Sequence, residues 1–167
     1  MKLSQILEAI RNFDIEKIKN SIDRGIELNP NADLTPLGLA AELGNSEMVN
    51  LLIERGANVN LTMDDEEGTT ALMMAAAAGN FEVTKILVES GADPNIKDCY
   101  GEHALAIAAR NAHEEIFNYL DPLTSPKWEP GDRVLEQAKR AKRMRNRKGV
   151  WVEVFNTDSD IKTTNTK

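Results

Sequence analysis

Cys99, His103 and His113 are the residues of this sequence whose types could support covalent or metal chemistry. The sequence has one cysteine and two histidines, and Cys99 precedes His103 by four residues, so a thiol and an imidazole can meet. A nucleophilic pair of this kind also needs a third group that orients the base, and none is evident. Neither histidine has a cysteine or a second histidine at the spacing of metal ligands. We therefore expect no enzyme activity, no metal site and no cofactor.

Four consecutive acids, Asp64, Asp65, Glu66 and Glu67, form a second chemical feature. Crowded carboxylates repel one another, so a run of this kind is typical of a solvated loop tip. A calcium site is a weaker alternative, because the Asp-x-Asp-x-Asp-Gly spacing of calcium loops is missing. A cluster of Lys and Arg on a partner protein would suit these acids better than calcium.

A basic run near the C-terminus is the third feature. Residues 133–148 contain eight basic residues and one acid. The eight are Arg133, Lys139, Arg140, Lys142, Arg143, Arg145, Arg147 and Lys148. Prolines at 122, 126 and 130 precede them, so we expect a Pro-rich linker over residues 122–131, then a basic helix and polar tail over residues 132–167. Side chains of alternating character at residues 150–155 also allow a short strand there.

Three interpretations of the basic run remain open. It can neutralise nucleic-acid phosphates, dock on an acidic surface of this chain or of a partner, or cap the end of the preceding domain. The net charge is −7 for the whole chain, but residues 1–125 carry 9 basic and 21 acidic residues, a net charge of −12. Residues 126–167 carry 11 and 6, a net charge of +5. We favour docking or capping, since the acidic part would repel a phosphate backbone.

Composition excludes several other classes of protein. No apolar run approaches the roughly 18 residues that span a bilayer. The N-terminus lacks the apolar region of a signal peptide. The single cysteine cannot form an internal disulfide, which fits a reducing compartment. We therefore expect a cytoplasmic monomer without a membrane span.

The elements that position these features repeat along the chain. Residues 35–41 are echoed by residues 70–76 and 103–109, and self-similarity at such a period is typical of stacked units. Apolar residues at helical spacing predict a second helix in each unit, and a glycine turn follows the first three of these helices. The turn glycines are Gly25, Gly56 and Gly91. The hydroxyls of Ser4, Thr35 and Thr70 predict helix starts, while Gly44 and Gly79 predict helix ends.

These motifs closely resemble the ankyrin-repeat family. The likeness is carried by Thr35-Pro36-Leu37, Gly44-Asn45 and Gly56-Ala57-Asn58-Val59-Asn60, with Gly79-Asn80 and Gly91-Ala92-Asp93-Pro94-Asn95 in register. It covers about residues 2–121 and implies an all-α solenoid of helix-turn-helix units with finger loops. The expected units are residues 1–31, 32–64, 65–97 and 98–121, within an array over residues 1–121. The first and last units look like degenerate end caps.

The sequence departs from the family pattern at several positions. The family's T-P-L-H histidine, which bridges adjacent repeats, is replaced by Gly38, Met73 and Ala106, so that bond is expected to be absent. His103 replaces a cap threonine, and Ala112 replaces a turn glycine. The first finger is shortened and the second is lengthened by two residues.

The resemblance implies that the concave side, formed by the ends of the short helices and the finger tips, binds another protein. Carrying the family's positions over gives Arg11, Asn12, Leu34, Glu42, Leu43, Glu66, Thr69, Ala77, Ala78, Cys99, Tyr100, Glu102, Arg110 and Asn111. We therefore expect a non-enzymatic module that presents a rigid concave surface to a folded partner. Two alternatives remain: a nucleic-acid-associated protein that uses the basic run, and an inhibitor or immunity-type protein that blocks a basic site with its acidic finger.

Overall fold

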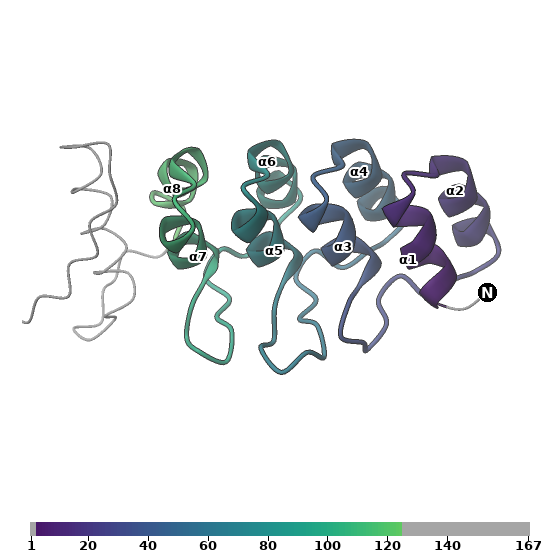
Figure 1. Ribbon diagram of the computed structural model, residues 1–167, viewed down its shortest axis with the longest axis horizontal. Helices are drawn as coiled ribbons and strands as arrows, with labels where there is room; N and C mark the ends of the chain where they lie inside the picture. Colours follow the sequence, from purple (N-terminus) through teal and green to yellow (C-terminus); the bar gives the residue numbers. More distant parts are fainter. Residues whose placement is uncertain (1–2, 125–167) are drawn as a thin grey trace, which may run out of the picture.

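The structure is a computed structural model that describes residues 3–124, in which eight α-helices stack as consecutive pairs (Figure 1). The first helices of the pairs are α1 (Leu3–Arg11), α3 (Pro36–Glu42), α5 (Ala71–Ala78) and α7 (Ala104–Arg110). The second helices are α2 (Ile15–Asp23), α4 (Ser46–Glu54), α6 (Phe81–Glu89) and α8 (Glu114–Leu120). The expected all-α solenoid is thereby confirmed. The expected basic helix and short strand lie outside the described residues.

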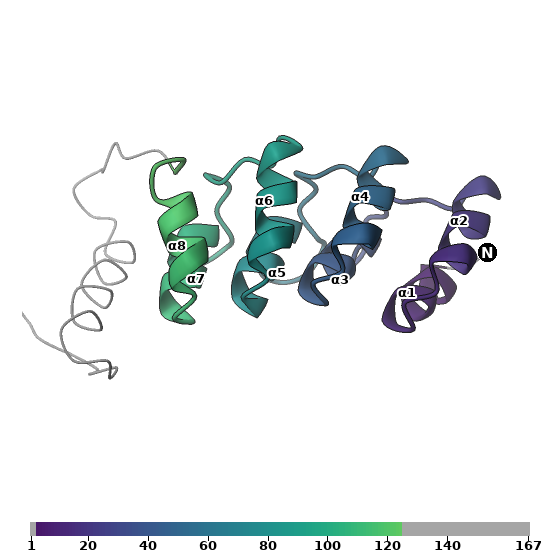
Figure 2. The ribbon, with the colours of Figure 1, turned by 90° about the horizontal axis from the view of Figure 1, so that it is seen from above.

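The two helices of each pair belong to two parallel rows. α1 packs on α3, α3 on α5 and α5 on α7, while α4 packs on α6 and α6 on α8. Figure 2 shows this succession from above, and Figure 1 shows the finger loops projecting from one side of the stack. Each pair shares its apolar face with its neighbours, so stacking rather than any single pair makes the core.

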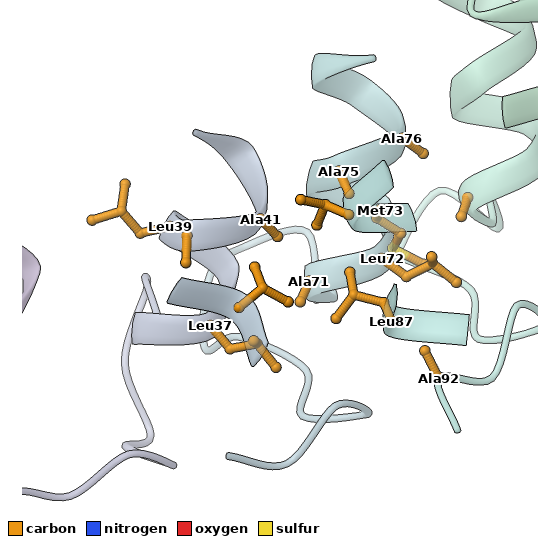
Figure 3. Packing of buried hydrophobic residues seen from close by; sticks show 14 of the residues in the cluster. Leu37, Leu39, Ala41, Ala71, Leu72, Met73, Ala75, Ala76, Leu87 and Ala92 are labelled. Carbon is orange, nitrogen blue, oxygen red and sulfur yellow. The ribbon is translucent and has the colours of Figure 1, made fainter. Parts of the chain in front are cut away.

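The core runs through the whole stack as one cluster of buried residues. Leu37, Leu72 and Leu105 occupy the same position in successive units and are at most 2% exposed. Burying a leucine contributes about 2–3 kcal/mol of hydrophobic stabilisation. The alanine three positions after each of these leucines is fully buried and leaves room for the neighbouring helix. Figure 3 shows Leu72 and Ala75 of one unit.

The helix starts expected at Thr35 and Thr70 are confirmed. Each threonine hydroxyl accepts the backbone N–H three residues later, at 3.0 and 3.3 Å. His103 does the same with Nδ1, at 3.3 Å, so an imidazole can replace the cap hydroxyl. The cap expected at Ser4 is wrong. Leu3 already belongs to α1 and packs against the core, so Ser4 lies inside the helix and does not mark its start.

Gly44 and Gly79 end the first helices of their units for two physical reasons. Both adopt left-handed backbone, with φ of 72° and 81°. A Cβ atom at either position would also lie 2.6 Å from a side chain of the next unit, Asn80 and His113 respectively. Ala112 holds the corresponding position in the last unit with φ of 68°, so the substitution that the sequence shows there keeps the turn conformation.

Asn80 and His113 tie neighbouring units together. The Asn80 Nδ2 group donates to the carbonyl oxygens of Ala41 and Glu42 at 2.8 and 2.7 Å. The His113 Nε2 atom lies 3.0 Å from the carbonyl oxygen of Ala77. These bonds give the units a polar connection that does not use the family's bridging histidine.

Two asparagines make a second polar connection at the turns. Asn29 donates to the Gly56 carbonyl at 3.1 Å and accepts from the Asn58 N–H at 2.7 Å. Asn60 repeats both bonds one unit later, with Gly91 and Asp93, at 3.0 and 2.7 Å. Both asparagine side chains are exposed, and their bonds restrain the spacing of adjacent turns because both partners of each amide belong to the next unit.

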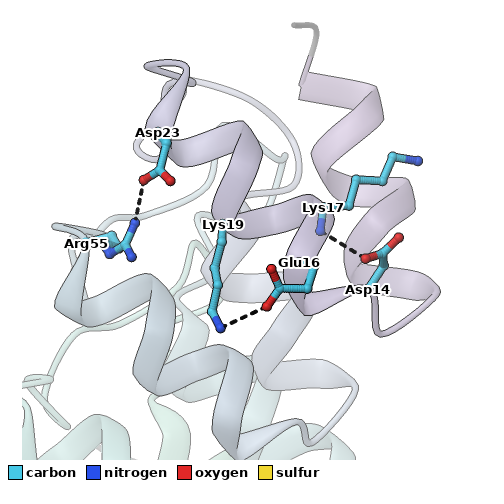
Figure 4. Close-up of polar contacts among 6 residues, drawn as sticks. All are labelled: Asp14, Glu16, Lys17, Lys19, Asp23 and Arg55. Carbon is cyan, nitrogen blue, oxygen red and sulfur yellow. Dashed lines mark hydrogen bonds and ion pairs between the residues drawn. The ribbon is translucent and has the colours of Figure 1, made fainter.

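The first pair differs from the others at its turn. Phe13, which stands where later units have Gly44 and Gly79, adopts φ of 55° and is 52% exposed. Its end of the stack also carries an ion pair between Arg55 and Asp23 at 3.0 Å, drawn in Figure 4. Exposed ion pairs contribute about 1 kcal/mol or less. The packing of α1 on α3, more than this ion pair, therefore holds the first two helices on the stack.

Candidate functional site

An open cleft of about 320 Å³ lies between two fingers and the ends of three first helices. We call it the finger cleft. It is lined by Glu42, Glu67, Thr69, Met73, Met74, Ala77, Ala78, Asp98, Tyr100, Glu102, Ile107 and Arg110. These residues come from the second finger (residues 61–69), the third finger (residues 96–102) and helices α3, α5 and α7. Three successive units therefore contribute to one surface.

The structure brings half of the expected partner-binding residues together in the finger cleft. Those that line it are Glu42, Thr69, Ala77, Ala78, Tyr100, Glu102 and Arg110. Those that lie elsewhere on the array are Arg11, Asn12, Leu34, Leu43, Glu66, Cys99 and Asn111. Leu34, Thr69 and Glu102 are half-buried, and the other members of the two sets are exposed.

Sequence reasoning missed five residues of the lining: Glu67, Met73, Met74, Asp98 and Ile107. Helical spacing could have indicated three of them. Met73 and Met74 precede Ala77 and Ala78 by one helical turn, and Ile107 stands one turn before the end of α7. Residues three or four apart lie on the same face of a helix. The cleft therefore has a deeper apolar floor than the expected residues alone would give.

Both fingers that border the cleft are fixed by an aspartate near the tip. Asp65 Oδ1 accepts from the Gly68 N–H and, at 3.0 Å, from the Thr69 N–H. Asp98 Oδ1 accepts from the Tyr100 and Glu102 N–H groups at 2.9 and 2.8 Å. The two carboxylates thus take up backbone donors that would otherwise face water.

A backbone hydrogen bond also joins the two fingers. The Cys99 N–H donates to the Glu67 carbonyl at 2.8 Å. Within the second finger, Met63 and Thr69 are joined by a further backbone bond of 2.8 Å, next to an isolated antiparallel bridge between Thr62 and Thr70. The fingers are therefore preorganised, since they are tied internally and to each other.

The finger cleft carries more negative than positive charge. Four carboxylates face one guanidinium, that of Arg110. Arg110 pairs with Glu102 at 2.8 Å, and the two side chains are 62% and 13% exposed. The remaining acids of the lining are Glu42, Glu67 and Asp98. The cleft therefore favours a cationic ligand.

Tyr100 is the most exposed large apolar side chain of residues 3–124, at 67%. The negative charge of the Cys99 thiolate raises the pKa of the Tyr100 phenol, and Glu67, desolvation and Asp98 add to this. The phenol stays protonated at neutral pH and can donate a hydrogen bond. An exposed tyrosine at the rim of a cleft combines apolar area with a polar tip, as hot-spot residues do.

The acidic run is only partly available to a partner. Asp64 accepts from the Asn31 amide at 3.1 Å, and Asp65 closes the finger tip. Glu66 and Glu67 are exposed. Two of the four carboxylates therefore have a structural role, which the sequence interpretation of a solvated loop tip did not distinguish.

Cys99 and His103 serve different purposes in the structure. Cys99 is exposed at the third finger, while His103 is buried and uses Nδ1 to cap α7. Within residues 3–124, no group of three or more His, Cys, Asp or Glu side chains is arranged to hold a metal ion. In the same part of the chain, no helix has both the length and the apolar character to cross a membrane.

The family comparison agrees with this architecture. A model of ankyrin repeats in three copies matches residues 6–98 and 62–122. The chain therefore belongs to the ankyrin-repeat family, whose repeats are generally protein–protein interaction modules. No curated protein matches the chain.

Proposed function

We propose that this protein binds a folded protein partner through the finger cleft and the adjoining helix ends, without catalysing a reaction. The observation that carries the proposal is the finger cleft itself, an open hollow to which three units contribute side chains and where Tyr100 is 67% exposed. An apolar floor, an aromatic side chain at the rim and an excess of negative charge in one cleft are typical of a surface that binds another protein.

The mechanism is presentation of a preformed surface. Asp65 and Asp98 fix the fingers, and the Asn80 and His113 side chains fix the spacing of the units. Binding then orders few groups, so less of the interaction free energy is spent on conformational entropy. Tyr100 and the alanines of α5 supply apolar contact, and the surrounding acids select for a partner with cations.

The alternative functions are less well supported by the described residues. An inhibitor that acts through its acidic finger would have Glu66 and Glu67 to offer, because Asp64 and Asp65 bond within the array. Nucleic-acid binding depends on residues 133–148, which lie outside the described part of the chain. The cytoplasmic location and the monomeric state stay predictions.

The proposal is tested by capture of partners from the native cell with the full chain and three variants. Tyr100→Arg and Leu43→Arg place a large cation in or beside the finger cleft, while Leu123→Arg changes an apolar side chain of similar exposure, 43%, which follows α8 and does not line the cleft. A protein captured by the wild-type and Leu123→Arg chains, but lost from the other two, supports the proposal. A protein that all four chains retain equally would place binding elsewhere. Circular dichroism checks that each variant keeps its helices.

A further inference from the structure

The surplus of positive charge in this chain lies outside the acidic array. Residues 133–148 carry eight basic residues and one acid, a net charge of +7. The finger cleft combines four carboxylates with one arginine, and that arginine is already paired with Glu102. The basic run and the finger cleft therefore carry complementary charge.

We propose that residues 133–148 of the same chain occupy the finger cleft and compete there with the partner. This inference rests on the proposed function, because it gives the same cleft an intramolecular occupant. The partner then has to displace a tethered cationic segment, so the segment regulates access to the cleft.

The end of the described chain lies within reach of the cleft. Thr124 is buried, and its N–H and hydroxyl both donate to the Leu120 carbonyl at 2.9 Å, which anchors this point on α8. Nine residue steps lead from Thr124 to Arg133, and an extended chain spans at most about 30 Å over that length. α8 packs on α7, which contributes Ile107 and Arg110 to the cleft. Packed helices lie about 8–10 Å apart, and the seven residues of α8 span about 10 Å, both well within the reach of the tether.

Tethering makes a modest affinity sufficient. A short linker that can span the two sites gives an effective concentration of the order of mM, so binding within the chain is favoured even if a free peptide binds weakly. The apolar residues of the run are Val134, Leu135, Ala138, Ala141 and Met144. They can contact Met74, Ala77 and Ala78 on the cleft floor while the cations meet the rim acids. Capping the end of the stack would instead rely on this narrow apolar stripe and on Glu114, Glu115 and Asp121 of the last unit.

The chain carries its own reporters for a test. Cys99 is the one cysteine, is exposed, and precedes Tyr100 at the cleft rim. Trp128 and Trp151 are the two tryptophans, and they flank the basic run. A bimane fluorophore on Cys99 loses emission when a tryptophan comes into contact with it. We expect the labelled full chain to be quenched relative to the Trp128→Phe, Trp151→Phe double variant.

Charge changes then distinguish cleft docking from other causes of quenching. Neutralising Lys139, Arg140, Arg143 and Arg147 to Gln, or raising the salt concentration, should abolish the quenching, since exposed charges are screened by salt. Glu42→Gln with Glu67→Gln should weaken it, whereas the matched pair Glu47→Gln with Glu54→Gln on α4 should leave it unchanged. Circular dichroism confirms that each variant is folded.

Three results would overturn the inference. These are full emission from the labelled chain at low salt, quenching that survives neutralisation of the run, and quenching that grows with protein concentration. The last would mean that a second copy supplies the segment. The dye assay contains no partner, so its failure leaves the Tyr100→Arg capture test intact, and a failed capture test does not affect the quenching.

Discussion

The helix stack and the finger cleft are built from the same repeats but follow opposite rules. In the stack, equivalent positions carry the same residue, as Leu37, Leu72 and Leu105 show. At the cleft, the equivalent helix ends are Glu42, Ala77 and Arg110, an acid, a small apolar residue and a base. Packing against like neighbours restricts a buried position in every unit, whereas an exposed helix end is free to carry different chemistry in each. The stack thus defines the shape, and the cleft defines what the shape can bind.

Leu72→Ala should show the largest difference in stability between the buried stack and the exposed helix ends. Leu72 is 1% exposed in the middle of the core, and removing its side chain from such a site costs about 2–5 kcal/mol of unfolding free energy. Leu43→Ala removes the same atoms from a 39% exposed position at the end of α3 and should cost about 1 kcal/mol or less. Urea unfolding of both variants measures the difference. Equal losses would contradict the division between buried stack and exposed helix ends.

Gly79→Ala should have the next largest effect, because the position is restricted by its own backbone and by the next unit. An alanine in left-handed backbone costs about 1–2 kcal/mol. At Gly79 the added Cβ would also meet the His113 ring at 2.6 Å and disturb its contact with Ala77, which adds about 1 kcal/mol.

The matched control for that variant is Gly56→Ala. Gly56 has φ of 92°, yet nothing lies within 4 Å of a Cβ atom built there, so only the backbone cost applies. Thermal or urea unfolding compares the two variants. A Gly56→Ala variant as unstable as Gly79→Ala would show that contact between units adds nothing to the requirement for glycine.

Repetition made the stack predictable from the sequence. Thr35, Thr70 and His103 recur before the same apolar pattern, so each supports the assignment of the others, and all three cap a helix. Ser4 lacks that support, since its unit has no T-P-L motif, and α1 begins before it. The assignment failed where the sequence offered a local signal without a repeat to confirm it.

The details of the cleft were harder to foresee, because they depend on contacts between units. At Gly38, where the family has its bridging histidine, a Cβ atom would lie 2.8 Å from Met63 Cε of the second finger. The lengthened finger thus fills the space that a larger side chain would need. Met74, which is half-buried, likewise lines the cleft, together with Met73, which is only 1% exposed. A pattern read one unit at a time does not show which neighbour covers a residue.

The smallest expected effect is on the titration of Tyr100, which tests whether the two fingers act on one another at the cleft rim. Cys99, the largest cause, and then Glu67 of the other finger raise the pKa of Tyr100 above its ordinary value of 10.0. The folded chain therefore holds the phenol proton more tightly than the unfolded chain does. Its contribution to stability is present below the pKa of the unfolded chain and is lost as the pH rises through the pKa of the folded chain.

Near-ultraviolet absorbance of phenolate, taken as the difference between the wild-type and Tyr100→Phe chains, follows the titration of Tyr100. Cys99→Ala, within the same finger, should lower the midpoint more than Glu67→Gln, and a midpoint that Glu67→Gln does not move would mean that the two fingers are too far apart in solution to influence each other.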